Sequence, residues 1–183
     1  MTNFEISILL WIQENLRGVM DGFWIFITSL ADKGVFWILL GAILLCFKKT
    51  RTTGVTLLIA LLINHVMTNI ILKDLFGRPR PYMQSEELVT LIRQLSSYSF
   101  PSGHTSVSFS GALVLYRMMP KKVSIPALIL AAMIGFSRLY VGVHFPTDVL
   151  GGIVVGIIAS TAAYYLVQYL GRKNKFFNMK EKL

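Results

Sequence analysis

The stretch T-G-V-T-L-L-I-A-L-L-I-N-H-V-M-T-N-I-I-L, residues 53–72, contains no Asp, Glu, Lys or Arg. An α-helix rises about 1.5 Å per residue, so about twenty residues cross the hydrocarbon layer of a bilayer. Three further apolar segments follow, at residues 104–119, 124–143 and 148–170, although some are short for a span. The sequence therefore predicts an all-α protein, a polytopic transmembrane helical bundle in which these segments are spanning or core helices.

The composition supports a single integral-membrane domain over residues 1–183. Apolar side chains make up 54% of the chain and charged ones 15%, whereas a soluble domain carries roughly a quarter charged positions. The net charge of +9 could indicate nucleic-acid binding. The basic residues flank apolar runs, however, and form no aromatic-interleaved patch, so membrane topology explains them better and we expect no nucleic-acid partner.

The first fifty residues leave the number of spans open. The segment from Phe23 to Phe47 is long enough to cross a bilayer, but Asp32 and Lys33 interrupt it, and charges at mid-bilayer depth are unfavourable. Residues 4–16 form an amphipathic pattern too short to span, in which Phe4, Ile8, Leu9, Trp11, Ile12 and Leu16 lie among Glu5, Gln13, Glu14 and Asn15. This pattern predicts an in-plane amphipathic helix within residues 1–20. We expect five spans and one surface helix, with a six-helix core as the alternative.

The distribution of charge predicts the orientation. Eleven of the eighteen Lys and Arg residues fall on one side of the expected spans, and eight of the nine acidic residues fall on the other. By the positive-inside rule the basic side is cytoplasmic, including the tail 172–183, and the loops 73–103 and 138–147 face outward. In the last span Gly152, Gly156 and Ser160 recur every four residues, which favours close helix packing.

The first candidate cluster lies where the 53–72 helix ends, in the run Lys73-Asp-Leu-Phe-Gly-Arg-Pro-Arg80-Pro81. Gly77 and the two prolines cannot continue the helix, and Pro81 biases Arg80 towards an extended backbone. A lysine and an arginine on a stiffened loop suit the oxygens of a phosphate group. A basic loop that touches lipid headgroups is an equally good reading of this cluster alone.

The second cluster is Phe100-Pro-Ser102-Gly103-His104, directly before an apolar helix. A helix that begins at such a turn presents free backbone N–H groups and the positive end of its dipole, which together favour an anion. His104 can exchange a proton near neutral pH and is a candidate general acid. Taken alone, a Ser-Gly-His turn is more often only the start of a helix.

The third cluster, Ser137-Arg138 followed by His144 and Asp148, precedes the last span. Pro146 suits a first helical turn, so a nearly helical i,i+4 spacing brings the Asp148 carboxylate within reach of the imidazole. The carboxylate can hold one ring nitrogen as N–H and leave the other free to attack phosphorus. The alternative is a His–Asp pair that only ties two helix ends together.

All three clusters map to the same membrane face and together match a known pattern. The chain resembles the type-2 phosphatidic acid phosphatase superfamily, whose signature reads K-x6-R-P, P-S-G-H and S-R-x5-H-x3-D. Every signature position is present, in order, across residues 73–148.

The apolar segments predict five to six helices, and the resemblance implies that they form a bundle with a core like that of the acid phosphatases and vanadium haloperoxidases. It implies a phosphohistidine on His144, oriented by Asp148, with His104 as the proton donor. It also implies a phosphate pocket, without metal or cofactor, formed by Lys73, Arg80, Ser102, Gly103 and Arg138.

The family acts on phosphatidate, phosphatidylglycerophosphate and polyprenyl diphosphates, so the substrate stays open. An outward-facing site on a small, bacterial-looking membrane protein favours undecaprenyl diphosphate, which is released on the outer leaflet during cell-wall assembly. A phosphatidylglycerophosphate or phosphatidate phosphatase is the alternative. A non-catalytic lipid-binding protein or transporter is an alternative of another class. Metal-dependent hydrolysis is disfavoured because the three histidines are spread over the helices without clustered carboxylates. We expect His65, inside the 53–72 span, to form an interhelical hydrogen bond.

Overall fold

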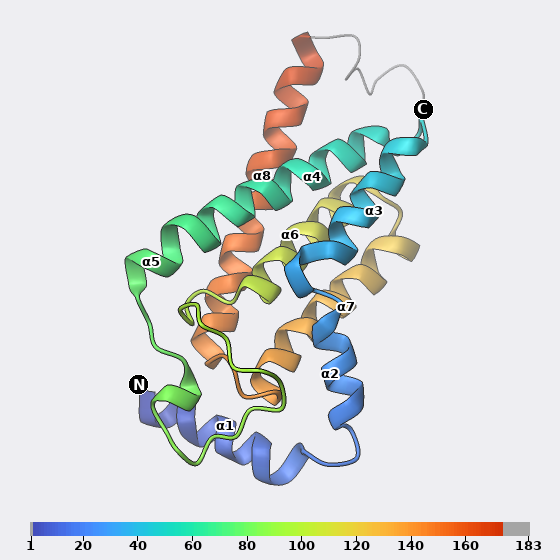
Figure 1. Cartoon of the computed structure of the whole chain (residues 1–183). Coiled ribbons are helices and arrows are strands. Elements are labelled where there is room, and N and C mark those ends of the chain that lie inside the picture. The colour runs from blue at the N-terminus through green and yellow to red at the C-terminus, as the bar shows by residue number, and fades with distance from the viewer. Residues whose placement is uncertain (1, 174–183) are drawn as a thin grey trace.

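The computed structural model describes residues 2–173, and within that range it contains helices and loops but no strand (Figure 1). The predicted all-α class is therefore confirmed. Residues 174–183, most of the expected basic tail, lie outside the described residues. The elements in chain order are α1 (Thr2–Leu16), α2 (Asp21–Ser29), η1 (Asp32–Gly34), α3 (Val35–Cys46), α4 (Arg51–His65), η2 (Val66–Leu72), α5 (Lys73–Phe76), η3 (Pro81–Met83), α6 (Gly103–Met118), α7 (Lys121–Tyr140) and α8 (Pro146–Lys173).

The four apolar segments all form helices. The 53–72 stretch lies in one continuous helical path through α4, η2 and α5, in which η2 is π-helical. By length and composition three helical stretches of residues 2–173 can cross a membrane, namely this path, α7 and α8, and the bent pair of α2 and α3 makes a fourth. Helix α6 has 16 residues and is the central core helix, packed against α4, α7 and α8.

The expected count of five to six helices is wrong. Residues 2–173 form seven helices when α4, η2 and α5 are counted as one and the three-residue 3-10 turns η1 and η3 are left out. The reason is the interruption at Asp32–Gly34, where Lys33 and Gly34 adopt φ of +52° and +70°. This left-handed backbone bends α3 by 41° from α2, so the Phe23–Phe47 segment forms two helices. Counted as one broken span, the same pair brings the helical stretches of residues 2–173 that can cross a membrane to four, so the expectation of five spans stays a prediction.

Helices α6 and α8 approach closely at the repeated small residues. A Cβ atom added to Gly152 would lie 2.8 Å from the carbonyl oxygen of Ser102, and one added to Gly156 would lie 2.7 Å from Cβ of Phe109. Real Cβ atoms do not come so near to other atoms, so any larger residue would separate the helices. This contact holds the first turn of α6 against the first turns of α8, where two of the candidate clusters lie.

Helix α1 lies across the end of the bundle opposite to the α3–α4 turn (Figure 1). Its buried face carries Leu9, which packs with Leu88 and Phe145, and Ile12, which packs with residues near the end of α7. Phe4 and Trp11 on its other face are exposed. The amphipathic helix expected in residues 1–20 is therefore present, and its position in the plane of a membrane stays a prediction.

Candidate active site

A cavity of about 570 Å³ lies between η1, α3, α4 and α6 and connects most of the candidate residues. At one end it is lined by Lys73, Arg80, Gly103, His104 and His144. Its remaining wall is largely apolar and includes Ile38, Leu58, Leu61, Leu62 and Val107. A cavity with a cationic end and an apolar body suits an amphiphile with an anionic head.

His144 lies at the cationic end, in the loop between α7 and α8, and is only 2% exposed. Pro146 begins α8 and places Asp148 in its first turn, as the spacing predicted. The His144 Nδ1 atom lies 3.4 Å from Asp148 Oδ2. The same carboxylate oxygen accepts hydrogen bonds from the Phe145 backbone N–H, at 2.8 Å, and from the Ser99 hydroxyl. Asp148 is thus fully buried but well supplied with donors.

The surroundings of His144 determine which ring nitrogen carries the proton. Nη1 of Arg80 lies 3.3 Å from Nε2 of His144. A guanidinium can only donate, so Nε2 must be the unprotonated nitrogen and Nδ1 carries the hydrogen towards Asp148. Burial, reinforced by the positive charges of Arg80 and Arg138, lowers the pKa of His144 to about 3 despite its hydrogen bond to Asp148. A neutral imidazole with its lone pair at the cavity is the form that a nucleophile requires.

Arg80 is fixed by the loop that follows it. Its backbone is extended at φ −80° and ψ 160° before Pro81, as the sequence predicted. Nε donates to the Ser97 carbonyl at 2.7 Å and Nη1 donates to the Val143 carbonyl at 2.9 Å. Lys73 Nζ donates to the Ser97 hydroxyl at 3.2 Å. The lysine and the arginine therefore converge on one loop residue beside His144.

Arg138 is 1% exposed, yet two of its three guanidinium nitrogens, Nε and Nη2, have no hydrogen-bond partner among residues 2–173. Its Nη1 donates to the Thr28 hydroxyl. A buried guanidinium with two unpaired nitrogens is unfavourable, and a phosphate group is an anion that such a planar fork binds well. Arg138 is therefore the strongest single indication that an anion belongs here.

The start of α6 offers an anion its backbone N–H groups, whereas the Ser102 side chain is engaged within the helix. Ser102 is the N-cap, and its buried hydroxyl accepts from the Thr105 hydroxyl at 2.9 Å. Its side chain points into its own helix and does not line the cavity, in contrast to Gly103 and His104. The N–H groups of the first helical turn have no intrahelical acceptor and remain available to an anion.

His104 is paired with a residue that the sequence had marked only as unfavourable. Its Nε2 lies 2.8 Å from Oδ1 of Asp32 in η1. The break between α2 and α3 thus brings an acidic side chain to the edge of the cavity. The interruption of the apolar segment was the available signal, but nothing in the sequence identified His104 as the partner.

The sequence also missed the groups behind Asp148. Arg78 donates from Nη1 to Asp148 Oδ1 at 2.7 Å, and its Nη2 lies 2.6 Å from Glu5 Oε2. Glu5 accepts in turn from the Thr147 backbone and hydroxyl, at 3.0 and 2.6 Å. Burial raises the pKa of Glu5, but the hydrogen bonds from Thr147 and Arg78 outweigh this effect and leave it lowered. Helix α1 is therefore connected to Asp148 through charged groups.

Among residues 2–173 no group of three or more His, Cys, Asp or Glu side chains could hold a metal ion. The positive charge near His144 comes instead from Lys73, Arg80 and Arg138.

Comparison with known proteins agrees with this geometry. The sequence model of the PAP2 superfamily matches residues 53–172. An undecaprenyl-diphosphatase of Sulfolobus acidocaldarius is 33% identical over 84% of this chain and 73% of its own length. The phosphatidylglycerophosphatase B of Bacillus subtilis is 32% identical over 93% of this chain and 80% of its own length.

A solved structure has the same fold. The crystal structure of Aquifex aeolicus LpxE superimposes with a TM-score of 0.77 at 29% identity, and the match covers 87% of this chain and 93% of that one. All the residues of the cationic end lie inside the region that the family model matches. The chain is a lipid phosphatase with membrane-spanning helices, and it belongs to the PAP2 superfamily.

Proposed function

We propose that the protein hydrolyses a polyprenyl diphosphate, undecaprenyl diphosphate in particular, to the monophosphate through a phosphohistidine on His144. The observation that carries this proposal is the position of His144 Nε2, 3.3 Å from Arg80 Nη1 at the cationic end of a largely apolar cavity. A lipid chain can occupy the apolar part while its terminal phosphate meets the nucleophile.

The first step forms a bond between His144 Nε2 and the terminal phosphorus and breaks the bond from that phosphorus to the bridging oxygen. The lipid phosphate leaves on the bridging oxygen and takes a proton from His104, which becomes the base for the second step. Asp148 holds the Nδ1–H and stabilises the charge that develops on the ring. Lys73, Arg80, Arg138 and the N-terminus of α6 stabilise the transferred phosphoryl group.

In the second step water attacks the phosphohistidine. The bond between phosphorus and Nε2 breaks, the proton of the water passes to His104, and inorganic phosphate is released. Asp32 accepts a hydrogen bond from His104 Nε2 and so turns its Nδ1 atom away from η1. This assigns Asp32 the role of a positioning residue for the acid and base function of His104.

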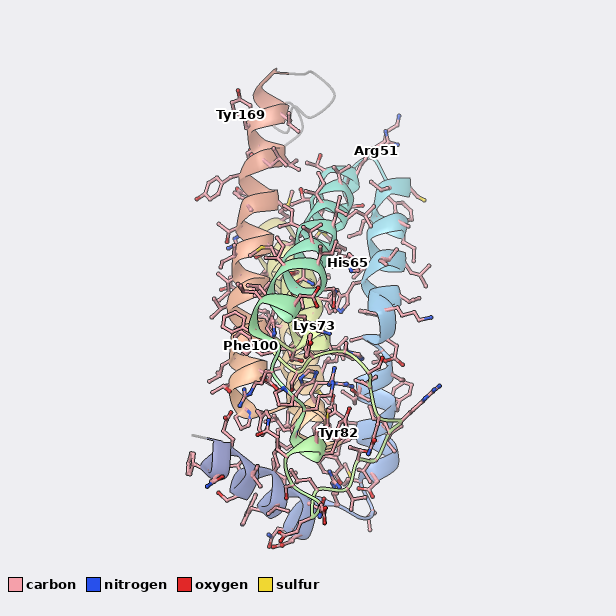
Figure 2. All side chains as sticks on the ribbon, turned by 60° about the vertical axis from the view of Figure 1, so that its left-hand side comes forward. Arg51, His65, Lys73, Tyr82, Phe100 and Tyr169 are labelled. Carbon is pink, nitrogen blue, oxygen red and sulfur yellow. The ribbon has the colours of Figure 1, made fainter. Side chains whose placement is uncertain are left out.

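The proposed membrane face follows from charge. Lys48, Lys49 and Arg51 lie at the α3–α4 turn. Arg117 lies in the last turn of α6, and Lys121 and Lys122 begin α7. In Figure 2 Arg51 is at the opposite end of the bundle from Tyr82, and Lys73 lies towards the Tyr82 end. If the basic end is cytoplasmic, His144 and its cavity open near the outer face, where undecaprenyl diphosphate is released.

A substrate panel tests this function. Purified protein in one detergent is given a polyprenyl diphosphate, phosphatidylglycerophosphate and phosphatidate, and phosphate release is measured for each. We expect the highest kcat/KM for the diphosphate. Much faster release from phosphatidylglycerophosphate would instead support the second candidate, which the similarity to the Bacillus subtilis phosphatidylglycerophosphatase favours.

A non-catalytic role in lipid binding or transport is tested separately. His144→Ala should abolish phosphate release while the protein remains folded in detergent. Unchanged release would exclude His144 as the nucleophile.

A further inference from the structure

Along α4, η2 and α5 the side chains that line the cavity change from apolar to polar and then to cationic. Leu58, Leu62, His65, Asn69 and Lys73 all line the cavity and are spaced three or four residues apart. They form one stripe along a continuous helical path, with the apolar residues at one end and Lys73 at the other. Figure 2 shows His65 on this path between Arg51 and Lys73.

His65 and Asn69 are the polar residues in the middle of the stripe. The hydrogen bond of His65 runs within the helix, from the Asn69 amide to Nδ1 at 3.2 Å, and not between helices as the sequence had suggested. Because the amide nitrogen can only donate, Nδ1 is the acceptor and Nε2 carries the proton. Both side chains are exposed and border the cavity. Polar residues at membrane depth that face a cavity indicate a ligand path.

The π-helical segment η2 begins directly after His65 and ends at Lys73. Such segments are rare and frequently occur at functional sites. Here η2 keeps Asn69 and Lys73 on the same side as His65.

Another cation borders the same cavity from a different element. Lys33 belongs to η1 and is held in the left-handed region at φ +52°. Asn69 adjoins the cationic end, since its Oδ1 lies 3.7 Å from the position that a Cβ atom on Gly103 would take. His65 and Asn69 therefore continue the polar lining of the cavity from the cationic end towards the apolar wall.

We propose that His65, Asn69 and Lys33 form a subsite for the proximal phosphate of a lipid diphosphate, the one bonded to the lipid alcohol. The order of the stripe is the order of such a molecule: Lys73 for the terminal phosphate, Asn69 and His65 for the proximal phosphate, and Leu62 and Leu58 for the chain. The inference rests on the proposed function and specifies its substrate class. A lipid monophosphate, with its only phosphate at His144, leaves these donors unmatched, so the subsite favours diphosphates.

The test compares farnesyl diphosphate with farnesyl monophosphate on the purified full-length protein in detergent. In His65→Leu/Asn69→Leu, we expect kcat/KM for the diphosphate to fall by about 10- to 100-fold, the usual effect of losing hydrogen bonds to a charged group. The monophosphate value should change by less than about threefold, because no subsite contact is lost. Ile70→Ala is the matched control, since Ile70 lies on the same segment, is 58% exposed and does not line the cavity.

His65→Gln distinguishes binding from folding. Gln retains a donor that can reach the same region, so this variant should keep the wild-type preference for the diphosphate within about threefold. An equal loss on both substrates, or no loss on either, overturns the subsite. A wild-type enzyme that shows no preference for the diphosphate overturns the proposed function and the subsite with it. A wild-type preference that the double variant retains overturns the subsite alone.

Discussion

Replacing Asp148 with Asn tests how the carboxylate controls His144. Every group around the Asp148 oxygens is a donor. Oδ2 faces the Ser99 hydroxyl, the Phe145 N–H and His144 Nδ1, and Oδ1 faces Arg78 Nη1 at 2.7 Å. An asparagine supplies one oxygen and one NH₂ group, so the NH₂ must oppose donors on one side or the other.

Both orientations of the amide are unfavourable. With the NH₂ towards Arg78, a charged donor loses a hydrogen bond worth about 1.5–3 kcal/mol. With the NH₂ towards His144, the imidazole must accept at Nδ1 and carry its proton on Nε2, which then opposes the Arg80 guanidinium and has no lone pair for attack. Because a wrong tautomer in a Ser-His-Asp triad lowers kcat about 10⁴-fold, we expect a loss of roughly 10³- to 10⁴-fold in Asp148→Asn.

The assay is phosphate release from a lipid diphosphate at saturating substrate, with thermal unfolding measured on the same preparation. Ser99→Ala is the matched control, because it removes one donor and leaves the carboxylate in place, and we expect a loss of less than about tenfold. An Asp148→Asn enzyme that folds normally and keeps kcat within about tenfold of wild type would show that the carboxylate does not control the tautomer of His144.

Asp32→Asn should lower kcat by about tenfold or more on a lipid monophosphate, because its alkoxide leaving group needs a proton from His104. The same variant should lower kcat only a little on nitrophenyl phosphate, whose leaving group needs no proton. Equal losses on both substrates would show that Asp32 does not act through His104. Activity should be unchanged in EDTA, because Lys73, Arg80 and Arg138 supply the positive charge, and a metal requirement restored by added cation would contradict this. Burial lowers the pKa of His144 to about 3, whereas an unfolded histidine titrates near 6.5. As the pH is lowered from roughly 6.5 to 3, the unfolded chain therefore binds a proton that the native protein does not. The free energy of unfolding should fall over that range. His144→Ala should lose less stability over that range, as measured by thermal unfolding at several pH values, and an unchanged pH dependence would count against a buried neutral imidazole.

Much of the fold could be predicted because the thickness of the bilayer sets the length of an apolar helix that crosses it. The 53–72 stretch and the 124–143 and 148–170 segments had the apolar length of membrane helices, and their ends were marked by prolines, glycines and basic residues. The close packing at Gly152 and Gly156 was also readable, since small residues four apart face one side of a helix.

The break at Asp32–Gly34 was harder to interpret from sequence. Two adjacent charges in an apolar segment indicate an interruption but not its geometry. Lys33 and Gly34 in the left-handed region bend the chain, and Asp32 finds His104, which is 72 residues away. Neither the backbone conformation nor the partner leaves a local pattern, which is why the helix count was wrong.

Within the site, the residues on short motifs were easier to place than those held by long-range contacts. Asp148 lies one helical turn after His144, so their proximity followed from the spacing. Ser99, Arg78 and Glu5 reach the same carboxylate or its partner from two other segments, and only the folded structure reveals them. For Ser102 the motif gave the position but not the use of the side chain. The resemblance placed its hydroxyl in the phosphate pocket, whereas in the structure this hydroxyl caps α6.

The most direct test of the central claim is to trap the phosphoryl group on the protein. Enzyme is mixed with a lipid diphosphate radiolabelled in its terminal phosphate, quenched in alkali within the first turnover, and digested for mass spectrometry. The account predicts a label that survives alkali, is lost in acid, and maps to His144, with none in His144→Ala. An unlabelled wild-type enzyme that still releases phosphate, or an equal label in His144→Ala, would contradict it.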